Sequence, residues 1–331
     1  MQSNESTTTP STPIVREGGL AIDSEQAESF LQEHFHPAVS NVEGIGAGAW
    51  SRCFGFRVDG EELVVRFGAY VDDFVKDQRA YTYHAPGLPV PEVRIIGSAF
   101  DGYYAVSTRC YGDFLDHLDP DRWLAVVPSV VDALEAMRMS DLSTTSGYGS
   151  WGEHGHAPHA KWSGHLLRVA DDTPERRNFG WRALLAANAP EDDETFSWGL
   201  DRLQGLADEI DRSTPRSLYH ADLMNRNVLV DGTRISGVFD WGCACYGDHL
   251  YDLAWFEFWA PWYPELDIPP LRAELERRWQ KVGYTPEHLT ARLQACYLHI
   301  GLDHLAYNAW LRDWPTLSAT ARQMRSLVEN I

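Results

Sequence analysis

The spacing of hydrophobic residues changes along the chain from largely alternating to helical. Near the start, apolar residues between 24 and 35 recur every three or four positions, which predicts an amphipathic helix. The segment ending at Val58 and residues 62–67 alternate around an Asp-Gly turn, and strands are also expected over 93–96 and 103–107. This part of the chain is expected to form a β-sheet with an accompanying helix.

Helical spacing dominates from residue 115 onward. A wide apolar stripe over residues 123–137 predicts a core helix, and further helices are expected over 183–189, 198–210 and 248–259. Residues 271–331 predict two or three more amphipathic helices. A mainly helical region therefore follows the β-rich one.

Two short apolar segments, residues 218–230 and 235–241, interrupt the helical region on either side of an Asp-Gly pair that is typical of hairpins. Their strand ends and one loop carry four polar residues: His220, Asp222, Asn227 and Asp240. Phosphoryl transfer from ATP requires a carboxylate beside the attacking hydroxyl, and oxygen ligands that hold Mg²⁺ against the triphosphate. These residue types therefore favour a phosphotransferase site. The alternative is that both Asp residues cap turns and His220 is a hydrogen-bonded core residue.

The order His220-x-Asp222-x-x-x-x-Asn227, followed by Asp240-Trp241-Gly242, resembles the catalytic loop and metal-binding Asp of aminoglycoside phosphotransferases. The resemblance implies an α+β, two-lobed protein-kinase-like fold, with a small β-rich N-lobe and a larger mainly helical C-lobe. It implies ATP and Mg²⁺ as cofactors, with Asp222 as the catalytic base and His220 bracing the loop. Asn227 and Asp240 are the implied metal ligands.

A glycine-rich segment precedes the second predicted strand. Gly46, Gly48 and Ser51 are expected to cover the phosphates, since glycines let backbone amides approach them closely; a plain hairpin is the alternative. Arg66 stands where kinases carry a Lys, and Asp77 in the following helix is its expected partner. The other possibility for Arg66 is a surface position on an edge strand.

Ser107 and Arg109 lie at the end of the last predicted strand, just before a connector over residues 110–113. Kinases bind adenine through the backbone of this connector, so both residues are assigned to the nucleotide by chain order. The predicted organisation is a flexible tail, a nucleotide-binding N-lobe and a catalytic, substrate-binding C-lobe: residues 1–20, 21–109 and 110–331.

Residues 141–149, 218–241 and 300–305 are similar to the hygromycin B phosphotransferases within this family. Sugars and aminocyclitols commonly stack on aromatic rings, and carboxylates can bind their amino groups. The expected substrate residues are Asp222, Glu257, Trp259 and Asp303. The alternative for the tryptophan is a place in the core of the helical region.

Composition narrows the range of partners. An excess of 48 acidic over 28 basic residues gives a net charge of −20, which disfavours nucleic acid and anionic membranes and would attract a small cationic substrate. Five cysteines without a Cys-x-x-Cys pair fit reduced thiols.

No secretory signal or membrane-length apolar run is evident, so a cytoplasmic monomer is expected. His154, His156, His159 and His165 lack regular spacing, which favours a Gly-rich loop that touches or merely covers the substrate over a metal site.

These features favour an ATP-dependent O-phosphotransferase that inactivates an aminoglycoside or aminocyclitol antibiotic, hygromycin B in particular. One alternative is a kinase of the same fold for another small hydroxyl compound, such as a macrolide, an amino alcohol or a sugar. Another is a pseudokinase that binds nucleotide but transfers no phosphoryl group. The presence of Arg66 in place of the usual kinase Lys favours this alternative.

Overall fold

The computed structural model describes residues 22–47 and 51–331, which form two compact units. The first unit ends at Gln78 and resumes over Pro91–Arg109, and all other residues from Arg79 onward belong to the second. The expected tail over residues 1–20 and Gly48 lie outside the described residues.

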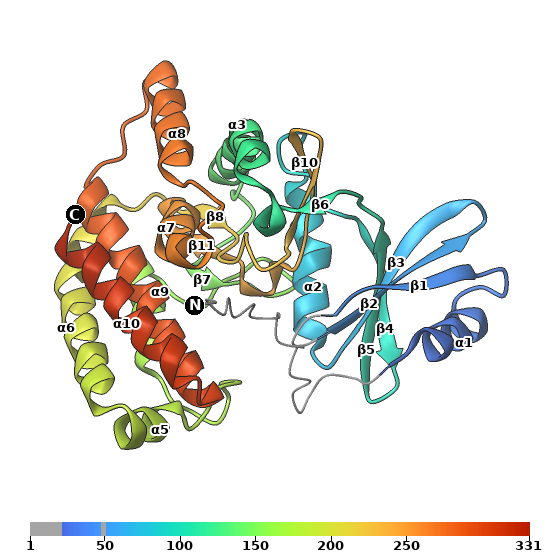
Figure 1. Ribbon diagram of the computed structural model, residues 1–331, viewed down its shortest axis with the longest axis horizontal. Helices are drawn as coiled ribbons and strands as arrows, with labels where there is room; N and C mark the ends of the chain where they lie inside the picture. The colour runs from blue at the N-terminus through green and yellow to red at the C-terminus, as the bar shows by residue number, and fades with distance from the viewer. Residues whose placement is uncertain (1–21, 48–50) are drawn as a thin grey trace, which may run out of the picture. The chain divides into compact units, whose positions relative to one another are not determined.

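The first unit is built on a five-stranded antiparallel sheet with strand order β1-β2-β3-β5-β4 (Figure 1). Its elements are α1 (Ser24–His34), β1 (Ser40–Ala47), β2 (Ser51–Val58), β3 (Glu61–Gly68), α2 (Val71–Ala80), β4 (Val93–Ala99) and β5 (Gly102–Thr108). The predicted helix and strands of this region all form. Alternating side chains of β2 and β3 supply the core, including Phe56, Val65 and Phe67.

Helix α1 begins where the sequence expects it because Asp23 forms a capping box with Gln26. The Asp23 carboxylate accepts the Gln26 N–H at 2.8 Å, and the Gln26 amide oxygen accepts the Asp23 N–H at 3.0 Å. Ala27, Phe30 and Leu31 then turn to the buried side of the helix.

The second unit combines short strands with helices. Its strands are β6 (Asp113–Phe114), β7 (Gly149–Ser150), β8 (Ser217–Tyr219), β9 (Val228–Asp231), β10 (Arg234–Val238) and β11 (Cys245–Gly247). Its α-helices are α3 (Pro120–Arg138), α4 (Trp162–Leu166), α5 (Trp181–Asn188), α6 (Pro190–Ser213), α7 (Leu250–Trp259), α8 (Pro269–Val282), α9 (Leu289–Leu311) and α10 (Trp314–Glu329). Helices α6, α9 and α10 lie side by side (Figure 1), and α9 is buried on most of its sides instead of being amphipathic. No helix within the described residues is long and apolar enough to cross a bilayer.

Residues 79–90 belong with the second unit because their contacts are there. The Tyr83 and Tyr246 hydroxyls lie 2.6 Å apart, the Val238 N–H donates to the Pro89 carbonyl at 2.7 Å, and Leu88 is buried in the second core. The functional division into residues 21–109 and 110–331 stays a prediction.

A buried ion pair holds the start of α7. Arg292 of α9 donates from Nε and Nη2 to the two Asp248 oxygens at 2.7 and 2.6 Å, and both side chains are at most 1% exposed. The same carboxylate accepts the Leu250 N–H at 3.0 Å. Burial opposes ionisation of Asp248, but the hydrogen bonds and charge of Arg292 outweigh it and lower the pKa of Asp248. The first turn of α7 is therefore fixed by a charged pair inside the core.

Candidate active site

The predicted catalytic residues lie in the loop between β8 and β9 and just after β10, all within the second unit. Strand β8 pairs with β11, and β9 pairs with β10 across the Asp-Gly turn, so both ends of the loop are held by sheet hydrogen bonds. The apolar side chains of these strands, such as Leu218 and Val228, are buried in the core. The polar residues between them are thereby presented at the strand ends.

The backbone of this region is held in an uncommon conformation. Four of the nine non-glycine residues with positive φ in the described chain are here: Ala221 (φ 66°), Asn225 (φ 58°), Arg226 (φ 65°) and Asp240 (φ 62°). Such conformations are uncommon for residues other than Gly, Asn and Asp, and they persist where the surroundings over-determine them, often at functional sites. Their concentration here makes the two segments candidates for the functional site.

His220 and Asp252 provide those surroundings. Asp252, in the first turn of α7, accepts the His220 N–H at 2.9 Å and the Ala221 N–H at 2.8 Å. The His220 ring is fully buried, and its Nδ1 accepts the Asp222 N–H at 3.2 Å. Its Nε2 therefore carries the proton and donates to the Phe239 carbonyl at 3.1 Å. His220 thus links the two segments of the site.

Asp222 is half-buried, and each of its carboxylate oxygens accepts one amide. Asn225 Nδ2 donates to Oδ1 at 2.6 Å, and Asn227 Nδ2 donates to Oδ2 at 3.0 Å. Burial raises the pKa of Asp222 to about 7; the Asn225 and Asn227 hydrogen bonds oppose this shift, and the nearby Asp240 charge reinforces it. A fixed carboxylate whose pKa lies near neutrality suits a general base.

Asn227 and Asp240 have the donor chemistry that a magnesium ion requires. The Phe239 N–H donates to the Asn227 carbonyl at 3.0 Å, which brings the residue before Asp240 against Asn227. Asn227 directs its amide nitrogen to Asp222, while Asp240 is exposed and its side chain has no hydrogen-bond or ion-pair partner among the described residues. The Asp240 carboxylate, the Asn227 amide oxygen and the Asp222 carboxylate are hard oxygen ligands. This set of ligands fits Mg²⁺.

The predicted phosphate-contacting residues lie in the first unit. Gly46 of β1 pairs with Cys53, and Ser51 opens β2 opposite Gly68. The Arg66 guanidinium on β3 is hydrogen-bonded and ion-paired with Asp77 of α2, which is the partner that the sequence predicts. Both side chains are mostly buried, at 14% and 10% exposure, so the pair is shielded from water.

Ser107 and Arg109 differ in their surroundings. Ser107 lies within β5, opposite Val64 of β3. Arg109 is ion-paired with Glu43 at 2.8 Å, and its guanidinium lies against Gly55, in space that a Cβ at residue 55 would occupy. The sequence alone did not reveal this contact. A nucleotide contact by either residue stays a prediction.

The predicted substrate residues of the second unit already have partners within the chain. Arg272 donates to both Glu257 oxygens at 2.5 and 2.8 Å, and the Tyr297 hydroxyl also donates to this carboxylate. Asp303 is paired with Arg176 at 3.3 Å. Trp259 is half-buried, with its ring 4.6 Å from His304 and 5.0 Å from Trp262. Substrate contact by Glu257, Trp259 or Asp303 stays a prediction.

Three of the histidines of residues 154–165 contact neighbouring side chains, and the His159 and His165 ring centroids lie 5.9 Å apart. His156 Nδ1 lies 2.9 Å from the Ser146 hydroxyl, and the His165 ring stacks on Trp162 at 5.3 Å. In the part of the chain that the structure describes, no three His, Cys, Asp or Glu side chains gather as metal ligands.

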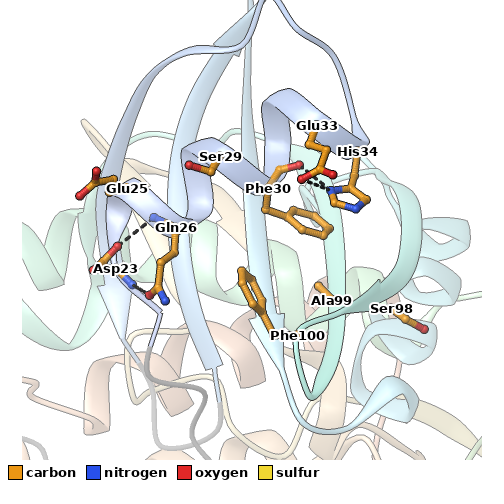
Figure 2. A pocket seen from close by; sticks show the side chains of 10 residues that line it. All are labelled: Asp23, Glu25, Gln26, Ser29, Phe30, Glu33, His34, Ser98, Ala99 and Phe100. Atoms are coloured by element: carbon orange, nitrogen blue, oxygen red, sulfur yellow. Dashed lines mark hydrogen bonds and ion pairs between the residues drawn. The ribbon is translucent and has the colours of Figure 1, made fainter.

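An open hollow of about 680 Å³ lies on the first unit between α1 and the β4–β5 turn (Figure 2). Its polar side chains are largely engaged with one another: Asp23 and Gln26 form the α1 cap, and Glu33 lies 3.9 Å from His34. None of the predicted site residues lines it.

The fold and the loop geometry define a phosphoryl-transfer protein. The chain matches the phosphotransferase enzyme family over residues 42–291, and it belongs to that family. Hygromycin-B 4-O-kinase of Escherichia coli is 33% identical over 290 residues, which cover 86% of this chain and 79% of that enzyme. A homoserine kinase of Neisseria meningitidis serogroup B is 35% identical over 82 residues, 24% of this chain and 26% of that enzyme.

Solved structures agree with this assignment. A thermostable mutant of aminoglycoside phosphotransferase APH(4)-Ia, in ternary complex with AMP-PNP and hygromycin B, has a TM-score of 0.77 and 31% identity. The match covers 91% of this chain and 97% of that chain. The predicted family and the α+β protein-kinase-like fold are confirmed.

Asp252→Asn is expected to lower kcat about tenfold to a hundredfold. An Asn offers one acceptor oxygen where Asp252 offers two, so the His220 or Ala221 N–H loses its partner and the loop shifts. The matched control is Asp211→Asn, since Asp211 accepts a backbone N–H and a hydroxyl from Ser163 outside the loop. Steady-state kinetics with thermal unfolding checks this. A kcat that falls no more in Asp252→Asn than in Asp211→Asn would contradict the anchoring role.

Proposed function

We propose that the protein is an ATP-dependent O-phosphotransferase that phosphorylates a hydroxyl of hygromycin B or a closely related cationic aminocyclitol glycoside, and so confers resistance. The main observation that supports this proposal is that Asn225 and Asn227 donate hydrogen bonds to the two oxygens of the Asp222 carboxylate in the family's catalytic loop. The similarity to hygromycin-B 4-O-kinase over most of both chains supports the substrate.

In this proposal, each polar residue of the loop has one role. Asp222 orients the acceptor hydroxyl and takes its proton, and His220 and Asp252 hold the loop. Asn227 and Asp240 would hold Mg²⁺, which when bound neutralises charge on the triphosphate. Arg66, which is paired with Asp77, would contact phosphate, and Gly46 and Ser51 would contribute backbone and hydroxyl donors.

The net charge of −20 supports a cationic substrate, because an acidic surface raises the local concentration of polycations. We further propose a cytoplasmic monomer: ATP is available there, and all five cysteines are free thiols, as a reducing compartment requires.

The decisive experiment is a coupled assay of ADP release with ATP and Mg²⁺ across a panel of acceptors. The panel contains hygromycin B, other aminoglycosides, a macrolide and amino alcohols, including homoserine because of the partial match to a homoserine kinase. Turnover on hygromycin B supports the proposal, and mass spectrometry of the product counts the phosphates added. Turnover on another acceptor alone would replace the substrate. ATP binding without ADP release would favour a pseudokinase.

Arg66→Ala is expected to raise the KM for ATP about tenfold while changing the KM for the antibiotic little, because it removes one charge-assisted phosphate contact. Arg66→Lys should recover part of this loss, since it keeps the charge without the forked geometry. The matched control is Arg57→Ala, which removes an exposed strand Arg paired with Glu62. An unchanged KM for ATP in Arg66→Ala would contradict the proposed contact between Arg66 and phosphate.

A further inference from the structure

We propose that Tyr263 and Asn225 are positioning residues that hold the Asp222 carboxylate in its reactive orientation through a relay of two hydrogen bonds. The inference rests on the proposed function, because orienting Asp222 has a catalytic consequence only if Asp222 acts on an acceptor hydroxyl. Neither residue belongs to the motif that identifies the loop.

The relay has a defined direction. The Tyr263 hydroxyl donates to Asn225 Oδ1 at 3.0 Å, and Asn225 Nδ2 donates to Asp222 Oδ1 at 2.6 Å. An ionised carboxylate can only accept hydrogen bonds, so the amide nitrogen of Asn225 must face Asp222. Its amide oxygen then faces Tyr263, whose hydroxyl must be the donor. Each link of the relay therefore fixes the next.

Asn225 reaches Asp222 because of its backbone conformation. Asn225 and Arg226 are consecutive residues with φ of 58° and 65°, and the Arg226 N–H is held by Asp116 Oδ1 at 3.2 Å. Asn is among the few residues other than Gly that tolerate this region. The resulting turn brings the Asn225 side chain back to the carboxylate three residues earlier.

Asn225 is exposed, so its side chain needs a second contact to remain in place. Tyr263 supplies it from a rigid position. It follows the 3₁₀ turn Ala260–Trp262, its N–H donates to the Ala260 carbonyl at 3.1 Å, and its ring packs against the core. With Asn227 holding Oδ2 and the relay holding Oδ1, the carboxylate is restrained at both oxygens. Loss of either restraint allows it to rotate.

Tyr263→Phe removes only the hydroxyl and tests the relay. We expect kcat to fall about tenfold, with the KM for ATP and for hygromycin B each within about twofold of wild type, since ground-state binding is untouched. In an Asn225→Gly background the relay is already broken, so adding Tyr263→Phe should lower kcat no further. The matched control is Tyr284→Phe, whose hydroxyl lies 3.1 Å from His249 outside the loop; its kcat should equal that of wild type.

Several outcomes would overturn the relay. A wild-type kcat in Tyr263→Phe would do so, as would independent, multiplicative losses in the double variant. A raised KM for hygromycin B with unchanged kcat would make Tyr263 a direct substrate contact instead. If the wild-type protein releases ADP and Tyr263→Phe is equally active, the relay is contradicted but the proposed function is not. A wild type that releases no ADP with any acceptor removes the proposed function and the relay together.

Discussion

Asp222→Asn is expected to lower kcat on the order of 10³-fold while leaving ATP binding nearly intact. The substitution keeps the shape of the side chain but removes the group that takes the proton, and positioned general bases contribute about 10²–10⁴-fold. Asp231→Asn is the control, because it neutralises an exposed carboxylate in the same hairpin. Steady-state ADP release and calorimetric ATP titration separate the two effects. Turnover of Asp222→Asn at the rate of Asp231→Asn would show that another group is the base.

The stability of the same variant distinguishes lost chemistry from lost structure. The pKa of Asp222 is raised to about 7, so the fold favours its neutral form. Its contribution to the free energy of unfolding is complete below the unfolded-state pKa of about 4 and is lost as pH rises through about 7. Without metal or nucleotide, Asp222→Asn should therefore be at least as stable as wild type at pH 8. A large fall in unfolding temperature there would mean that the activity loss reflects misfolding.

The sequence predicts the parts of the site that lie close together in the chain. His220, Asp222 and Asn227 occupy one loop between two apolar strands, and their spacing is itself the pattern that identifies the family. Arg66 and Asp77 are also near in sequence, and a strand followed by a helix brings them together. In both cases local periodicity determines the geometry.

The contacts that depend on packing could not be predicted in this way. Tyr263 reaches Asn225 across 38 residues of sequence, and no spacing rule connects them. The pairing of Glu257 with Arg272 of α8 is a second example, because no spacing rule in the sequence links these two side chains. The Arg109 guanidinium lies beside Gly55 of β2, which is distant from it in the sequence. Each case requires the tertiary fold to select one partner among many polar residues.

Arg292→Ala is expected to lower the free energy of unfolding by about 3–5 kcal/mol, because it leaves the Asp248 carboxylate buried without a counter-charge. The loss should narrow as pH falls. The lowered pKa of Asp248 contributes stability above its unfolded-state pKa, and wild type loses that contribution as pH falls through the folded-state pKa. Arg277→Ala is the control: its Arg is 60% exposed and pairs with Glu274 within one helix, so the free energy of unfolding should change much less than in Arg292→Ala.

The Asp248–Arg292 pair also connects the core with the catalytic loop, so Arg292→Ala should affect both. Asp248 accepts the Leu250 N–H at the start of α7, and Asp252 in the first turn of that helix accepts the His220 and Ala221 N–H groups. Below its unfolding temperature the variant should therefore lose kcat as well as stability, whereas the control should lose neither. A double variant, Asp248→Asn with Arg292→Met, removes both charges and should be more stable than Arg292→Ala, because no unpaired charge stays buried. Urea unfolding of the three variants measures this. Equal stability of the double variant and Arg292→Ala would mean that lost packing, and not the stranded carboxylate, sets the cost.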